Sequence, residues 1–212
     1  MNDPIREIVN NAIRKYFEEH KKEFDDRITV TEAIYCLRRS WFRRKNPDLE
    51  FQPSVYTFIG HAVHEALLNH IDGKSEVEFE FGDVVGHADA VVEIDGEPTI
   101  LELKVVGEIP RKPDYEYALQ LNAYLCMSGI NQGYLVYFNR TNGDVRSFKI
   151  TPNKHLFRYV MQRAYQLRKA LEKDELPQED NDFVAKYCFF CPYRELCKPN
   201  EDNSNSKQSK LF

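Results

Sequence analysis

Apolar residues in the first third of the chain recur every three or four positions, with charged residues between them. Such spacing is typical of amphipathic helices, and it predicts helices over residues 3–24, about 29–45 and about 54–70. Thr29 and Glu32 have the spacing of a capping box, which marks the start of the second helix. The chain is therefore expected to begin with a helical region.

From residue 76 onward the pattern changes to the alternation of apolar and polar residues that is typical of strands. The turn residues Asp95-Gly96 and Thr141-Asn142-Gly143 each separate two such segments and predict hairpins. The expected elements are strands 76–81, 84–94 and 99–106, a helix 115–127, strands 133–139 and 145–150, and a helix 152–173. This order of helices and strands predicts an α/β (α+β) fold.

Length and composition are those of a globular protein. The chain has 212 residues, of which 42% are hydrophobic, and is expected to form one domain with appendages. No apolar stretch approaches the roughly 18 residues of a membrane span, and the N-terminus lacks the features of a signal peptide, so we expect a cytoplasmic protein. The formal net charge of -5 does not predict nucleic-acid binding, but local patches and bound cations can override it.

Two charged residues stand inside an apolar strand. Glu102 and Lys104 lie in the segment 100–106, where alternation places both on one face. Symmetrical pairing around the preceding hairpin turn sets Asp89 opposite Glu102, and two carboxylates so close repel each other. A divalent metal ion between them would remove the repulsion. The alternative is that Glu102 and Lys104 are solvent-facing residues of a half-exposed strand.

Three residues on the flanking helices can complete such a site. His64 is a candidate third metal ligand, although a lone helical histidine is more often a surface or core residue. Gln120 and Tyr124 are spaced by four residues and share one face of the helix that follows the Lys104 strand. By itself, each of these signals is weak.

Four short motifs, taken in order, resemble those of RecB-like nucleases of the PD-(D/E)xK superfamily. The motifs are Gly60-x-x-x-His64, Gly86-x-x-Asp89, Glu102-x-Lys104 and Gln120-x-x-x-Tyr124. The resemblance implies a restriction-endonuclease-like core, with a mixed central sheet flanked by helices, and phosphodiester hydrolysis as the reaction. It also implies an Mg²⁺ or Mn²⁺ ion bound by His64, Asp89 and Glu102, with the backbone carbonyl of Leu103 as an additional ligand.

The resemblance implies catalytic roles for the neighbouring residues too. Lys104 would orient the attacking water and stabilise the charge that grows on the phosphate, while Gln120 and Tyr124 would steady the DNA and the site. These roles are chemically consistent, because a divalent metal ion lowers the pKa of water and offsets the charge of the scissile phosphate.

The cysteines predict a second metal centre. The chain has 5 cysteines, and Cys188-x-x-Cys191 with Cys197 forms a compact triplet that needs a fourth ligand. Cys126 lies in an apolar helical stretch and is interpreted as a buried thiol. Cys36 is left as the partner of the triplet, and it would tie the N-terminal helices to the C-terminal segment.

Two chemistries fit four thiolates. Zinc is the default, whereas the aromatic residues Phe189, Phe190 and Tyr193 beside the triplet would protect an iron–sulfur cluster from solvent. One cysteine before the nuclease motifs and three after them resemble the arrangement in iron–sulfur RecB-like nucleases, and the compact size is similar to that of the CRISPR-associated exonuclease branch. This resemblance implies a [4Fe-4S] cluster, action on single-stranded DNA ends, and partnership with CRISPR integrase proteins during spacer acquisition. Leu37 stands where family members often have proline, which leaves ligation by Cys36 intact.

The resemblance extends from about Thr31 to Cys197 and implies a domain layout. Residues 1–197 would form one RecB-like nuclease domain, with N-terminal helices in 1–50, the nuclease core in 54–173 and the cluster-binding segment in 186–197. Residues 198–212 are polar and are expected to form a disordered tail.

The segment 38–45 beside Cys36 combines five basic residues with Trp41 and Phe42. This segment can bind single-stranded DNA through phosphate contacts and base stacking. A solvated basic helix face is an equally good interpretation.

The preferred hypothesis is a metal-dependent DNA exonuclease with a structural [4Fe-4S] cluster that works in CRISPR adaptation. One alternative is a RecB-like nuclease of the same chemistry in recombination or repair, of cellular or viral origin. Another is a noncatalytic DNA-end-binding subunit that keeps the fold and the cluster. The complete set of His64, Asp89, Glu102 and Lys104 speaks against this last alternative. The sequence leaves cleavage polarity and oligomeric state open.

Overall fold

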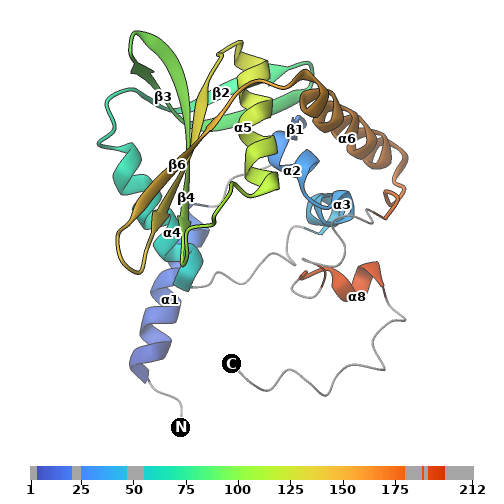
Figure 1. Cartoon of the computed structure of the whole chain (residues 1–212). Coiled ribbons are helices and arrows are strands. Elements are labelled where there is room, and N and C mark those ends of the chain that lie inside the picture. The colour runs from blue at the N-terminus through green and yellow to red at the C-terminus, as the bar shows by residue number, and fades with distance from the viewer. Residues whose placement is uncertain (1–3, 21–24, 47–54, 180–187, 189–190, 199–212) are drawn as a thin grey trace.

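The structure is a computed structural model, and it describes residues 4–20, 25–46, 55–179, 188 and 191–198 (Figure 1). The predicted disordered tail, apart from Lys198, lies outside the described residues, as do Phe189 and Phe190 of the predicted aromatic shell. None of the described helices is long and apolar enough to cross a membrane.

Within the described residues, a mixed sheet of six strands forms the centre of the molecule (Figure 1). The sequence analysis predicts a mixed central sheet and five of these strands. The strands are β1 (Ile28–Thr29), β2 (Lys74–Phe81), β3 (Val84–Ile94), β4 (Glu97–Val106), β5 (Gly133–Asn139) and β6 (Val145–Ile150). They lie in the order β1-β3-β4-β5-β6, and β2 pairs with β3. β1 is parallel to β3 and β4 is parallel to β5, whereas the other pairs are antiparallel.

Helices pack on both faces of this sheet (Figure 1). The described helices are α1 (Pro4–Glu19), α2 (Val30–Ile34), α3 (Leu37–Lys45), α4 (Val55–Leu68), α5 (Tyr115–Ser128), α6 (Lys154–Lys173) and α8 (Arg194–Cys197). α2, α5 and α6 pack around Ile100 and Leu135, while the end of α4 packs through Leu68 against Leu103. Ile100 and Leu103 thus point to opposite faces, as strand alternation predicts.

The helix predicted over residues 29–45 is interrupted. α2 ends at Ile34, α3 begins at Leu37, and Thr29 also belongs to the short strand β1, which the sequence pattern did not predict. The capping box itself is confirmed, because the Glu32 N–H donates to Thr29 Oγ1 and the Thr29 N–H donates to the Glu32 carboxylate. The predicted helix start at the capping box is therefore correct, whereas the predicted continuous helix over residues 29–45 is wrong.

A side chain distant in sequence contacts the backbone at the interruption. The Arg163 guanidinium of α6 donates to the carbonyl oxygens of Ala33 and Tyr35, both at 2.6 Å. In a continuous helix these carbonyls would accept amides one turn later, so the contacts with α6 replace helical hydrogen bonds. Cys36 is the N-cap residue of α3.

Two different strands, β1 and β4, pair with separate parts of one edge of β3. Val84 and Val85 pair with both β2 and β1, while Ala90 and Val91 pair with both β2 and β4. β1 and β4 therefore share the edge opposite to β2. Between them, residues 86–89 have no paired strand on that edge within the described part of the chain.

The register of the β3–β4 hairpin is the predicted one, because Ala90 pairs with Leu101. The next pair in this register would join Asp89 and Glu102, but the ladder ends one position earlier. Where two strands part, their backbone groups must find other partners. The two predicted metal-binding carboxylates thus lie where β3 and β4 separate.

Gly86 lies in this gap and makes room for Tyr124. A Cβ atom at position 86 would come within 2.4 Å of Cε1 of the Tyr124 ring. We expect Gly86→Ala to lower the free energy of unfolding by about 1–3 kcal/mol, the usual effect of overpacking, as measured by chemical denaturation. Gly60→Ala is the control, because no described atom lies within 4 Å of its Cβ and alanine favours a helix. Equal destabilisation by both substitutions would contradict the steric explanation.

Candidate active site

Lys104 connects the sheet to α5 through a chain of polar contacts. Its Nζ donates to Oε1 of Glu102 at 2.7 Å and to Oε1 of Gln120 at 3.3 Å. Nε2 of Gln120 donates in turn to the hydroxyl of Tyr124 at 2.8 Å. Burial raises the pKa of Tyr124 well above its ordinary value, so its hydroxyl stays protonated. The structure therefore brings together four of the predicted site residues.

Asp89 connects the site to α4. Its Oδ2 accepts the backbone N–H of Leu103 at 2.6 Å and lies 2.9 Å from Nε2 of His64. The hydrogen bond with Asp89 is the main cause that raises the pKa of His64, which favours an ion pair. The predicted role of the Leu103 carbonyl as a metal ligand stays a prediction, since the contact with Asp89 is made by the Leu103 amide.

Glu102 is the most deeply buried charged residue of the site. It is 1% exposed, and its Oε2 has no hydrogen-bond partner among the described residues. Burial raises the pKa of Glu102 to about 7; Lys104 opposes this shift, and the Asp89 carboxylate adds to it. A buried carboxylate oxygen without a partner is unfavourable unless a cation or a donor reaches it. The surroundings of Glu102 therefore fit a bound cation.

The side chains of the predicted metal ligands form two separate ion pairs, one of which includes Lys104. Within the described residues, no three His, Cys, Asp or Glu side chains are placed to hold one metal ion together. His64 contacts Asp89 instead, and Lys104 contacts Glu102. The unpartnered Oε2 of Glu102 beside a second carboxylate nevertheless fits a hard divalent cation. The assignment of His64, Asp89 and Glu102 as its ligands stays a prediction.

Tyr117 belongs to the site and was missed in the sequence analysis. The Nζ of Lys104 lies 4.7 Å from the centre of its ring, which is a cation–π contact. Tyr117, Gln120 and Tyr124 follow the i, i+3, i+7 spacing of one helix face. That spacing is the signal that could have identified Tyr117.

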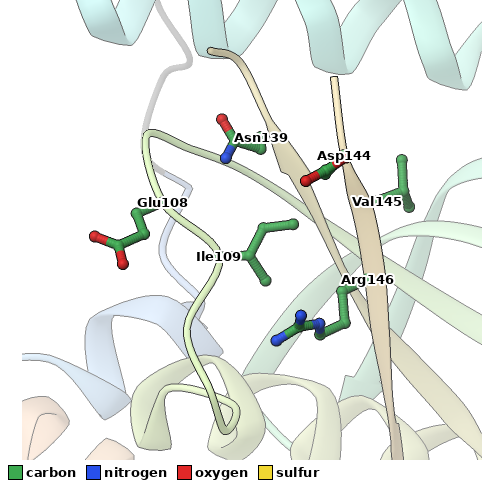
Figure 2. A pocket seen from close by; sticks show the side chains of 6 residues that line it. All are labelled: Glu108, Ile109, Asn139, Asp144, Val145 and Arg146. Carbon is green, nitrogen blue, oxygen red and sulfur yellow. The ribbon is translucent and has the colours of Figure 1, made fainter. Parts of the chain in front are cut away.

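A cavity of about 300 Å³ lies between the loop that follows β4 and the β5–β6 hairpin (Figure 2). Its lining residues are Glu108, Ile109, Asn139, Asp144, Val145 and Arg146. None of them is a predicted site residue, and two carboxylates in the lining would repel a phosphate. The cavity therefore does not mark the predicted catalytic site.

The four predicted cluster ligands occupy one neighbourhood. Burial is the main cause that raises the pKa of Cys188, and the nearby thiols of Cys36, Cys191 and Cys197 add to the shift. Cys36 begins α3, whereas Cys197 ends α8, so segments far apart in the sequence meet here. Cys126, which the sequence analysis interprets as a buried thiol, is only half-buried on α5.

Side chains around the thiols join the two segments. Arg38 of α3 donates to the Sγ of Cys197 at 3.8 Å and to the carbonyl of Pro177 at 2.8 Å. The rings of Phe42 and Tyr193 stack with their centres 5.9 Å apart. Tyr193 of the predicted aromatic shell is buried, at 2% exposure. The thiols thus lie beside a packed contact between α3 and the C-terminal segment.

Part of the basic segment 38–45 is used within the protein. Arg44 donates to both carboxylate oxygens of Glu32 at 2.6 and 2.7 Å, and this ion pair is largely buried. Lys45 contacts Asp174 at 2.5 Å. At Arg44 the burial favours a structural role over both a DNA contact and a solvated basic face.

Comparisons with known proteins agree with this geometry. The family model of the PD-(D/E)XK nuclease superfamily matches residues 7–198. The chain is 22% identical over 209 residues to the CRISPR-associated exonuclease Cas4 of Saccharolobus solfataricus, and the match covers 90% of this chain and 97% of that protein.

Solved structures share the fold. The crystal structure of SSO0001 is similar with a TM-score of 0.69 and 21% identity, over 91% of this chain and 96% of that one. A phage-related exonuclease from Haemophilus somnus 129PT is similar with a TM-score of 0.54 and 13% identity, over 71% of this chain and 95% of that one. The predicted restriction-endonuclease-like core, with its mixed sheet flanked by helices, is thereby confirmed.

Proposed function

Because the chain belongs to the PD-(D/E)XK nuclease superfamily, we propose that it is a divalent-metal-dependent exonuclease that hydrolyses phosphodiester bonds at DNA ends. The observation that carries this proposal is the buried Oε2 of Glu102, which has no described partner and lies beside Lys104 and Asp89. A catalytic cation would supply the positive charge that this oxygen lacks. The exonuclease name of the relative from Saccharolobus solfataricus supports the proposal.

Each site residue has a separate task in the proposed reaction. Asp89, Glu102 and His64 would hold Mg²⁺ or Mn²⁺, which would activate a water molecule and offset the charge of the scissile phosphate. Lys104, held by Glu102 and Gln120, would donate a hydrogen bond to the attacking water and stabilise negative charge on the phosphate. Gln120 would keep the Lys104 ammonium directed at the reacting atoms.

A [4Fe-4S] cluster bound by Cys36, Cys188, Cys191 and Cys197 is part of the proposal. The four thiolates would hold the cluster, and four cysteines are the usual ligand set of a [4Fe-4S] centre. The support comes from the proximity of Cys36, Cys191 and Cys197 to Cys188, whose pKa they raise, and from the packed contact beside the thiols. The cluster would tie α3 to the C-terminal segment.

The proposed setting is CRISPR spacer acquisition, with single-stranded DNA ends as substrate and CRISPR integrase proteins as partners. Its support is the name of the relative, which is described as CRISPR-associated. A nuclease of recombination or repair would use the same chemistry, and genome context would separate the two settings. A noncatalytic DNA-end-binding subunit is disfavoured because the chain keeps both Asp89, which accepts the Leu103 N–H, and the Glu102–Lys104 ion pair.

Digestion of DNA labelled at either end tests the function and its direction. In Mg²⁺ or Mn²⁺, we expect single nucleotides to be released progressively from one end of a single-stranded oligonucleotide, and a chelator to stop the release. Glu102→Gln is the matched inactive protein. Metal-dependent release that is equal in wild type and Glu102→Gln would reveal a contaminating nuclease, and no release by the wild type would contradict the proposal.

Metal binding should also raise the free energy of unfolding of the protein. Mn²⁺ at about 100 times its dissociation constant should stabilise the wild type by about 2.7 kcal/mol, which is roughly 5–10 °C in Tm for a chain of this size. We expect Glu102→Gln to lose most of this gain, because the buried ligand is neutralised. Glu80→Gln is the control, since Glu80 is an exposed acid on β2. Calorimetry of the chelated proteins, with and without added Mn²⁺, measures the gain in Tm for the wild type and for each variant. An equal gain in Glu102→Gln would exclude Glu102 as a ligand.

A further inference from the structure

Tyr56 and Arg140 form a contact away from the proposed catalytic residues. The Tyr56 residue is 67% exposed at the start of α4, and the Arg140 guanidinium lies 4.8 Å from the centre of its ring. Arg140 follows β5, and its backbone N–H donates to the carbonyl of Val106 at the end of β4. The pair therefore connects α4 to the end of the strand that carries Glu102.

The Arg140 guanidinium has no carboxylate or carbonyl acceptor in the part of the chain that the structure describes. Its neighbours there are the Tyr56 ring and Gly107, where a Cβ atom would lie 3.0 Å from Nη2. Arg163 and Arg168 differ, since each donates to carbonyl or carboxylate oxygens. A guanidinium held against a ring keeps its N–H donors available for an anion.

Two elements place this pair at a similar distance from the catalytic residues. Tyr56 precedes His64 by eight positions on α4, which is about 12 Å at the helical rise per residue. Arg140 lies three positions beyond Tyr137, the β5 residue that pairs with Lys104, which is about 10 Å along the sheet. Both estimates place the Tyr56–Arg140 pair roughly 10–12 Å from the proposed catalytic residues.

Gly60 opens the helix surface between Tyr56 and His64. The spacing of these three residues by four makes them successive neighbours on α4. A Cβ atom at Gly60 would have no described atom within 4 Å, so packing does not require glycine. Glycine costs a helix about 1 kcal/mol relative to alanine, but it allows a ligand to approach the backbone closely. The surface from His64 to Tyr56 is therefore open.

We propose that this surface holds the substrate DNA strand, with the Tyr56 ring stacked on a nucleobase and the Arg140 guanidinium on a phosphate. The distance from the site corresponds to about three nucleotides of a DNA strand. An aromatic ring accepts the face of any base, and a guanidinium matches a phosphate, so the pair positions the strand without reading its sequence. This inference rests on the proposed nuclease function and assigns strand-positioning residues to it.

Steady-state kinetics on a single-stranded oligonucleotide test the assignment. Tyr56→Ala should raise KM about 10- to 100-fold, the range for the loss of one base–aromatic stack, with kcat unchanged at saturation. Arg140→Gln should also raise KM, and Tyr56→Phe should stay close to the wild type. Tyr165→Ala is the matched control, because Tyr165 is 62% exposed on α6 and has the Nζ of Lys169 5.6 Å from its ring.

Two further substrates separate strand binding from an effect on the fold. Bis(p-nitrophenyl) phosphate is too small to reach Tyr56, so wild type and Tyr56→Ala should hydrolyse it equally. An abasic nucleotide at the stacked position should raise the wild-type KM and leave that of Tyr56→Ala unchanged. An unaltered KM in Tyr56→Ala, or an equal loss on the small ester and on DNA, would overturn the assignment. Wild-type protein that cleaves no DNA would refute the nuclease proposal itself, before any variant is compared.

Discussion

Lys104→Ala is expected to lower kcat for metal-dependent DNA hydrolysis by about 100- to 1000-fold, the typical effect of removing one donor that stabilises a transition state. The lysine Nζ is held at 2.7 Å from Glu102 and 3.3 Å from Gln120, so its charge has a defined position beside the proposed metal ligands. A shorter side chain leaves no cation there. Nucleotide release at saturating Mn²⁺ and DNA measures the change.

Lys149→Ala is the matched control for this experiment. Lys149 lies on β6 with its Nζ 6.0 Å from the centre of the Tyr134 ring, so it repeats the lysine–tyrosine contact without a buried carboxylate. Its kcat should equal that of the wild type. Both variants are compared with metal present, because Lys104→Ala removes the described partner of Glu102 Oε1. Equal rates for wild type and Lys104→Ala would contradict the assignment of Lys104 to catalysis.

Cys36→Ser is expected to abolish the broad visible absorbance of an anaerobically purified protein and to destabilise it strongly. A cluster that joins Cys36 to Cys188 closes a loop of about 150 residues, and a cross-link of that span stabilises a chain by about 5 kcal/mol. For a chain of this size the loss corresponds to roughly 10–20 °C in Tm. Absorbance and iron analysis measure the loss of the cluster, and calorimetry measures the loss of stability.

Cys126→Ser is the control for the cluster, because Cys126 is a half-buried thiol on α5. It should keep the colour and the iron content, and lose at most the small packing contribution of one sulfur atom. A colourless wild-type protein that contains stoichiometric zinc would contradict the cluster and leave a zinc site as the explanation for the four thiols.

The strands and the carboxylate pair could be predicted because their signals are local. Alternation and the Asp95-Gly96 turn determine the β3–β4 register, which places Asp89 and Glu102 one position beyond the last pair, Ala90 and Leu101. The spacing of Gln120 and Tyr124 likewise predicts a shared helix face, which the structure confirms. Each of these inferences depends on a few neighbouring residues.

What could not be predicted depends on partners distant in sequence. Arg163 of α6 contacts the backbone where the expected second helix is interrupted, and no pattern near Tyr35 indicates that contact. Arg44 belongs to the segment that was considered for DNA binding, but it forms a buried ion pair with Glu32. The two residues are twelve positions apart and can meet only because the chain turns between α2 and α3. The separation of β3 from β4 is also invisible in a strand pattern that continues unchanged through it.

The hairpin between β3 and β4 sets the relative position of Asp89 and Glu102, the two carboxylates that are proposed to bind the metal ion. Ala90 pairs with Leu101, and only the turn at Asp95-Gly96 sets the count of residues between Asp89 and Glu102. Deleting a single turn residue would slide one strand by one position and turn Glu102 to the opposite face. The length of this turn should therefore be invariant among active relatives, whereas the loop after β4, which sets no such count, can vary in length.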